Sequence, residues 1–241
     1  MTNFDFLLEE KKFSGFANTA ITAEKLYQID LPSCLFNVRR ALEFAVKWMY
    51  SVDSALVMPW DDRLVSLMST DEFRDIIDAD LLKRMEFIRK TGNFAAHTGQ
   101  KVKKEQAELC LQNLYIFLDF VAYCYADHYT VSNYDSTLLQ ENSVHTADQS
   151  VSQPVGDQAG QSETDLKLEQ LLKENAALRE ELTARREEQQ QTYVTKPLDI
   201  SEYETRKIYI DSMLQDAGWT EGQNWMNEYR IPGMPNKSLV G

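Results

Sequence analysis

The sequence predicts a mainly α-helical protein, and three observations support this fold class. Glycine and proline are scarce, with 9 and 6 among 241 residues, which favours long helices. Apolar residues recur at helical spacing through residues 1–130. A polar stretch, 131–163, then separates this part from two later stretches, 164–191 and 192–241, whose patterns are different. We therefore expect a helical bundle, a disordered linker, a short coiled-coil helix and the beginning of a further domain.

Residues 1–130 are expected to form a bundle of about five helices, because their apolar stripes have to be buried against one another. The first stretch, 16–30, has helical spacing and is closed by Pro32. Ser33 is placed to cap the next helix. A shorter helix, 70–77, begins with a threonine cap and acidic residues in its first turn.

Two longer helices of the bundle, 33–51 and 104–129, each carry one continuous apolar face. Residues of these faces are expected in the core: Leu35, Val38, Leu42, Ala45, Val46 and Met49, followed by Ala107, Cys110, Leu111, Leu114, Phe117, Leu118, Val121 and Cys124.

The linker 131–163 is rich in Ser, Gln, Asp and Thr and has few aromatic residues, which predicts disorder. The helix 164–191 has an a/d pattern of about three heptads, with an asparagine at one a position as in two-stranded coiled coils. The pattern comprises Leu168, Leu171, Asn175, Leu178 and Leu182. A homodimer through 164–191 and a solvated single helix that acts as a spacer are both compatible with this length.

The formal net charge of −13 excludes a chain that binds nucleic acid over its whole surface. Cys34, Cys110 and Cys124 lie inside apolar stretches with no Cys-x-x-Cys pair, which predicts buried free thiols in a reducing cytosol. No signal peptide and no run of ~18 apolar residues is present, so we expect a cytoplasmic protein without a membrane span. His128 and His145 have no companions at ligand spacing, so we assign no metal.

The last stretch carries a recognisable pattern. "ETRKIYIDSMLQDAGW" (204–219), followed by "EYRIPGMPN" (228–236), closely resembles the start of the nuclease domain in the restriction (R, HsdR) subunit of type I restriction–modification enzymes. In that family a helix precedes a strand and a Gly-Met-Pro turn. Two later strands then carry a catalytic Asp and a Glu-x-Lys motif. The resemblance implies that 192–241 is the start of an α/β nuclease domain, and the residue pattern predicts a helix at 199–219 and a strand at 224–231.

The family's catalytic motifs are not part of this sequence. The chain ends at Gly241, before the Asp and Glu-x-Lys motifs that would hold Mg²⁺, and no G-x-x-x-x-G-K-[ST] phosphate loop occurs. The resemblance implies an N-terminal piece of a longer protein. Glu204 is a weak candidate for the carboxylate that some nucleases of this fold place near the metal, and a solvated first-turn glutamate is the alternative.

A second motif, "FIRKTGNFAAHTG" (87–99), has Gly-Asn in the middle of a helical pattern, which predicts a break with Asn93 as the cap of a following helix. The motif is similar to the "R-x-x-G-N-x-A-x-H" pattern of the HEPN-like domain at the N-terminus of many of these restriction subunits. Its matching residues are Arg89, Gly92, Asn93, Ala95 and His97.

Catalytic HEPN ribonucleases use an Arg that steadies the phosphate and a His that acts as general acid or base. In that family four to six residues separate the two, whereas seven lie between Arg89 and His97, so we expect a structural role or a partner contact. A ribonuclease using both residues is the alternative. A cluster of basic residues beside the motif could contact DNA backbone or an acidic partner: Lys83, Arg84, Arg89, Lys90, Lys101, Lys103 and Lys104.

Together these resemblances imply the accessory and assembly region of a type I restriction enzyme's R subunit, which serves defence against foreign DNA. This chain should carry no cofactor, whereas its parent would use Mg²⁺ and ATP as a DNA translocase and endonuclease. The expected partners are the modification and specificity subunits, with DNA bound through the full-length parent. A stand-alone dimeric interaction protein is a further alternative.

Overall fold

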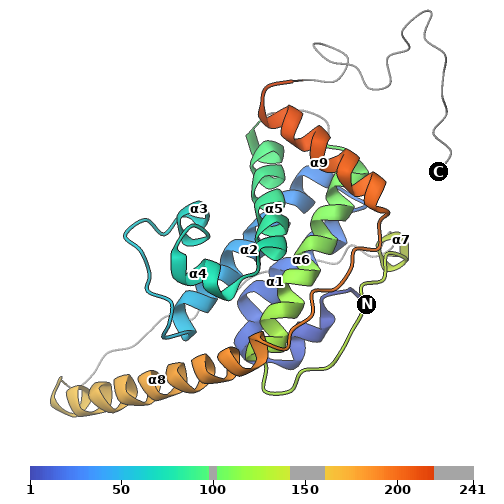
Figure 1. The fold of residues 1–241 in the computed structure, drawn as a ribbon. Helices are drawn as coiled ribbons and strands as arrows, with labels where there is room; N and C mark the ends of the chain where they lie inside the picture. The colour runs from blue at the N-terminus through green and yellow to red at the C-terminus, as the bar shows by residue number, and fades with distance from the viewer. Residues whose placement is uncertain (98–101, 142–160, 220–241) are drawn as a thin grey trace, which may run out of the picture. The chain divides into compact units, whose positions relative to one another are not determined.

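The computed structural model describes residues 1–97, 102–141 and 161–219 (Figure 1). This part of the chain is mainly helical and contains no strand, which confirms the predicted fold class at that level. The chain divides into two compact units, Met1–Ser201 and Glu202–Gly241. The strand predicted at 224–231 lies outside the described residues.

The first unit is a set of helices packed around α6, with two short 3-10 turns at the start. Its elements are η1 (Asp5–Glu9), η2 (Lys11–Phe13), α1 (Ser14–Leu26), α2 (Leu31–Val52), α3 (Leu64–Leu67), α4 (Asp71–Ile76), α5 (Ala79–His97), α6 (Lys104–Tyr125), α7 (Leu138–Glu141) and α8 (Gln161–Gln190).

Helix α6 lies at the centre of this unit, in contact with α1, α2, α5 and α8 (Figure 1). Almost every residue from Gln106 to Tyr125 is buried, because a helix enclosed on all sides has no face left for water. All the residues predicted for the apolar faces of 33–51 and 104–129 are buried, and the three cysteines are buried and free. Those predictions are confirmed.

The connection between α1 and α2 differs from the prediction. Helix α1 ends at Leu26, and Pro32 lies in the first turn of α2, where its missing N–H costs no hydrogen bond. The N-cap of α2 is Asp30 rather than Ser33, and the Ser33 hydroxyl donates to the Asp30 carboxylate. The predicted threonine cap is confirmed at α4, where the Thr70 hydroxyl accepts from the Phe73 N–H at 3.2 Å.

The beginning of the predicted linker packs on the bundle. Leu139 of α7 is buried, the ring of Tyr134 meets that of Tyr115, and the Asp135 N–H donates to the Asn3 side chain at 2.7 Å. Disorder was predicted for 131–163 because most of its residues are polar. A composition does not show that a few apolar residues, such as Tyr134 and Leu139, pack against the bundle. Residues 142–160 lie outside the described part of the chain.

The second unit is described only at α9 (Glu202–Asp216) and its end. Gly218, at φ 81°, ends this helix in the left-handed region that glycine adopts without strain. The Trp219 N–H donates to the Leu214 carbonyl at 2.8 Å, which closes the helix end.

Candidate functional site

The motif predicted from the sequence lies entirely on α5. Arg89, Gly92, Asn93 and Ala95 follow one another along this helix, and His97 is its last residue. The side chain of His97 lies outside the described part of the structure. The predicted break at Gly92-Asn93 is wrong: α5 runs through it, so Asn93 is a half-buried residue inside a helix and caps nothing.

Gly92 serves close helix packing. It is buried where α5 meets α2, and a Cβ added there would lie 2.6 Å from the Cβ of Arg39. Because the clashing atom is attached directly to the α2 backbone, the two helices would have to move apart to admit a side chain. The glycine that looked like a helix break is therefore required for the approach of α2 and α5.

Gly92→Ala should lower the free energy of unfolding by about 1–2 kcal/mol, because overpacking outweighs the better helix propensity of alanine. Gly15→Ala in α1 is the matched control. Nothing lies within 4 Å of the added Cβ at Gly15, so that change should stabilise the unit by about 0.5–1 kcal/mol. Urea unfolding of both variants measures the difference, and equal effects would contradict the close-packing role.

Arg89 is committed to a neighbour on its own helix. Its guanidinium donates to Glu86 at 2.9 and 3.2 Å, and its side chain is 19% exposed. His97 follows eight residues later, about 12 Å of helix rise away. The Arg89 guanidinium, which a ribonuclease would use to bind the scissile phosphate, is bound to the Glu86 carboxylate instead. This pairing weighs against the ribonuclease alternative.

We expect the chain to leave single-stranded RNA uncut, both with and without divalent metal. The assay is a time course with end-labelled RNA, with Arg89→Ala and His97→Ala as paired variants. Metal-independent cleavage that both substitutions abolish at an unchanged melting temperature would establish the ribonuclease instead.

The predicted basic cluster is partly neutralised in the structure by neighbouring carboxylates. Arg84 pairs with Asp80 at 2.8 Å, and the ammonium group of Lys104 lies over the ring of Tyr27 at 5.2 Å. Lys83 and Lys90 are exposed on α5, Lys103 precedes α6, and Lys101 lies outside the described residues. The arrangement offers less positive surface than the sequence indicated.

Two buried carboxylates of the first unit, Asp53 and Asp119, each accept several hydrogen bonds, and no sequence motif pointed to them. Asp53, at the end of α2, is fully buried and holds α8. The guanidinium of Arg186 donates to its carboxylate at 2.9 and 3.2 Å, the Thr183 hydroxyl at 3.0 Å and the Tyr125 hydroxyl at 2.7 Å. Arg179 also donates to the Asp53 carbonyl at 3.1 Å. We call this group the Asp53 anchor.

Electrostatics favour the charged form of this acid. Burial by itself would raise the pKa of Asp53, but hydrogen bonds from Arg186, Tyr125 and the Ala55 N–H outweigh burial and hold the pKa below its usual value. The same surroundings raise the pKa of Tyr125 well above its usual value, mainly through burial and then through the charge of Asp53. Tyr125 is therefore a protonated donor, and Asp53 is an ionised acceptor.

The second buried carboxylate, Asp119 of α6, holds residues 192–199, which we call the strap. Lys196 donates to it at 2.8 Å, Tyr193 at 3.1 Å and Tyr129 at 2.9 Å. Lys196 also donates to the Ser132 carbonyl, so it joins the strap to the segment that follows α6. We call this group the Asp119 anchor.

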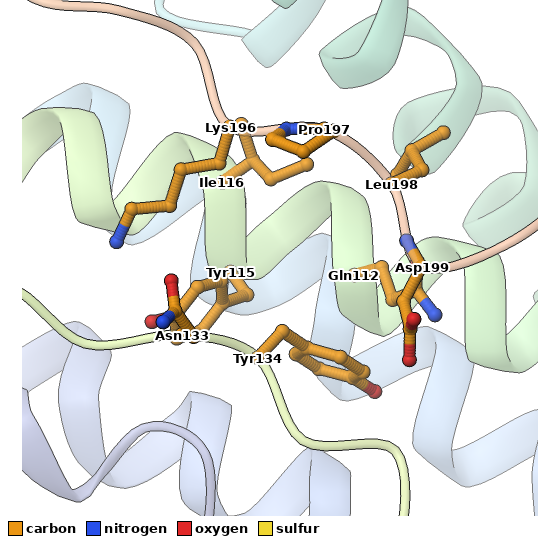
Figure 2. Close-up of a pocket in the computed structure, with 9 residues that line it drawn as sticks. All are labelled: Gln112, Tyr115, Ile116, Asn133, Tyr134, Lys196, Pro197, Leu198 and Asp199. Carbon is orange, nitrogen blue, oxygen red and sulfur yellow. The ribbon is translucent and has the colours of Figure 1, made fainter.

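A small pocket of about 190 Å³ lies between the strap, α6 and residues 133–134 (Figure 2). Its floor is α6, with Gln112, Tyr115 and Ile116, and the strap passes over it. The Asp199 N–H donates to the Gln112 side chain at 3.1 Å, which fixes the end of the strap. In Figure 2 the ammonium end of Lys196 points along α6, away from Gln112 and Asp199. This volume is below the ~300–1,000 Å³ of typical ligand sites, so we interpret the pocket as a gap in the packing between the strap and α6.

Glu24 of α1 is a third buried acid, and it ties down the N-terminus. Its carboxylate accepts from the Asn3 N–H at 2.9 Å and from the Asn3 side chain at 3.2 Å. Burial raises the pKa of Glu24 to about 7 in spite of these hydrogen bonds.

Because its folded pKa is raised, Glu24 should make the unit more stable at low pH. The contribution, up to ~3 kcal/mol, is complete below the unfolded pKa near 4.5 and is lost as the pH rises through about 7. Urea unfolding at pH 5 and pH 8 should show this difference for the wild type, and Glu24→Gln should remove most of it. Glu9→Gln, at an exposed position, is the control. An unchanged pH dependence in Glu24→Gln would contradict the assignment.

Among the described residues, no group of three His, Cys, Asp or Glu side chains gathers to hold a metal ion. Glu204 is exposed in the first turn of α9. No helix in the described ranges is both long enough and apolar enough to cross a membrane.

A comparison with protein families finds a match for more than half of the first unit. Residues 22–141, from the middle of α1 through α7, match a family described as "Domain of unknown function (DUF4145)". The match covers the helices that carry Gly92, Asp53 and Asp119, and it ends before α8 and the strap. No curated protein and no solved structure matches the chain.

Proposed function

We propose that this chain is the accessory and assembly region of the restriction subunit of a type I restriction–modification enzyme. The observation that carries the proposal is the ordered resemblance of residues 204–219 and 228–236 to the start of that subunit's nuclease domain. DNA cleavage, translocation, Mg²⁺ and ATP would belong to the parent protein.

The described end of α9 has the geometry that the resemblance predicts, which supports this proposal. The resemblance calls for a helix that closes at Ala-Gly-Trp, and α9 ends at Asp216 with Gly218 in the left-handed region. The Ala217 and Trp219 N–H groups donate back to the Met213 and Leu214 carbonyls at 3.1 and 2.8 Å. These are the hydrogen bonds of a glycine-terminated helix.

An assembly role suits the first unit because its polar residues are used for internal connections. The Asp53 anchor holds α8, the Asp119 anchor holds the strap, and Arg89 is paired with Glu86. Such an arrangement gives a stable body to which modification and specificity subunits could dock. It offers no activated nucleophile beside a base among the described side chains.

A competition experiment tests the proposal. The isolated chain is titrated into ATP-dependent DNA cleavage by the full-length restriction subunit and its modification complex. We expect inhibition, because the chain occupies the docking site without supplying a nuclease. The control is Asp53→Ala, which should destabilise the first unit and should therefore not inhibit DNA cleavage. Saturating chain without effect on cleavage, together with no binding to the modification complex, would refute the assembly role.

A further inference from the structure

Helix α8 has two different halves. Its second half is held on the bundle through Arg179, Thr183 and Arg186 of the Asp53 anchor. Before Arg179, the side chains of Leu171, Leu172 and Leu178 are 54%, 61% and 58% exposed. Three exposed leucines within eight residues are unusual on a helix in which polar and charged residues predominate.

The exposed leucines continue the side of α8 that contacts the bundle. Leu178 and Leu171 lie one and about three turns before Leu182, which is half-buried. Asn175, exposed, lies between them on the same stripe. From Leu182 onward this stripe is partly buried against the bundle. At Leu178, Asn175 and Leu171 the side chains are exposed. We call residues 171–182 of this stripe the seam.

We propose that the seam binds the seam of a second copy of this chain, as a parallel two-stranded coiled coil that begins in the first half of α8 and ends near Leu182. The proposal rests on the exposed side chains of α8 and does not depend on the restriction-subunit assignment.

The pattern of the seam favours a second copy over an unrelated partner. Leu171 and Leu178 occupy d positions, and Asn175 and Leu182 occupy a positions of consecutive heptads. An asparagine at an a position finds its best partner in the same asparagine of an identical helix. A general apolar groove on another protein would leave its amide without a hydrogen bond.

Charge determines the direction of the two helices. The g positions carry Glu174 and Glu181, and the e positions carry Arg179 and Arg186. Arg179 and Arg186 are bound to Asp53 of their own bundle, so the glutamates decide the direction, and parallel helices keep the g positions of the two copies apart. Antiparallel helices would bring the g-position glutamates of the two copies together, which is unfavourable.

The bundle sets the end of the coiled coil. Arg186 is 5% exposed and bound to Asp53, and Arg185 donates to Asp127 at 2.5 Å although it occupies a d position. Beyond Leu182 the helix therefore faces its own bundle. A pairing over residues 171–182 spans fewer than two heptads, so the dimer should dissociate on dilution.

Sedimentation of the full chain over a range of concentrations tests the proposal. We expect a reversible monomer–dimer equilibrium. Leu171→Glu and Leu178→Glu should each weaken dimerisation about a hundredfold without changing the melting temperature. Asn175→Leu should tighten the association and allow higher oligomers. Glu180→Gln, on the opposite face of α8, is the matched control and should behave as the wild type.

Cross-linking determines the direction of the helices. In a parallel dimer the two copies of residue 175 face each other, so Asn175→Cys should form an intermolecular disulfide under mild oxidation. The native cysteines are buried and should not compete. A chain that remains monomeric at its highest soluble concentration would overturn the proposal. So would a dimer that survives both leucine substitutions, or one that Asn175→Cys fails to cross-link.

Discussion

Replacing Asp53 by alanine should lower the free energy of unfolding of the first unit by about 3–5 kcal/mol. The substitution leaves the guanidinium of Arg186, which is 5% exposed, with Glu187 at 3.6 Å as its nearest carboxylate. It also removes the acceptor of the Tyr125 hydroxyl and one of the two acceptors of the Thr183 hydroxyl. A buried charge without a partner is among the largest single destabilising effects in proteins. We therefore expect α8 to leave the bundle before the remaining helices unfold.

Urea unfolding gives the energy, and hydrogen exchange at residues 179–190 shows whether α8 is released first. Asp62→Ala is the control. Asp62 pairs with Lys47 at 3.0 Å but is 68% exposed, so its loss should cost less than about 1 kcal/mol. The double variant Asp53→Leu with Arg186→Met should recover part of the loss, because it removes both charges together. A loss below 1 kcal/mol for Asp53→Ala would show that the anchor is not buried in solution.

The helical core could be predicted from the sequence because it depends on local periodicity. The apolar residues of α2 and α6 repeat at helical spacing, and each of those predicted is buried. The cap at Thr70 was also predictable, because the cap and the N–H that it accepts are three residues apart.

The anchors could not be predicted, because their partners are distant in sequence. Asp53 binds Arg186, which is 133 residues away, and Asp119 binds Lys196, which is 77 residues away. Gly92 was misinterpreted for the same reason: its neighbour Arg39 lies on another helix, and local rules treat glycine as a break. The one signal that could have indicated an anchor is the single aspartate within the long apolar run of α6.

The second large effect on stability is expected at Asp119, which holds the strap on α6. Asp119→Ala should lower the free energy of unfolding by about 3 kcal/mol, because the Lys196 ammonium and the hydroxyls of Tyr193 and Tyr129 lose a shared acceptor. The cost should be smaller than at Asp53, because the side chain of Lys196 is 18% exposed and can turn toward water. The strap should then detach from α6 while the helices remain folded.

Limited proteolysis detects that detachment as new cleavage within residues 192–199, and far-ultraviolet circular dichroism reports whether the helices persist. Asp199→Ala is the matched control within the strap. Asp199 is exposed and accepts one hydrogen bond from Ser136 at 3.1 Å, so its loss should leave the cleavage pattern unchanged. If Asp119→Ala lowers stability without exposing the strap, the carboxylate supports the core of α6 alone. In that case residues 192–199 are held by their other contacts, such as the ring of Tyr193 against Phe120 and Tyr123 and the Asp199 N–H on Gln112.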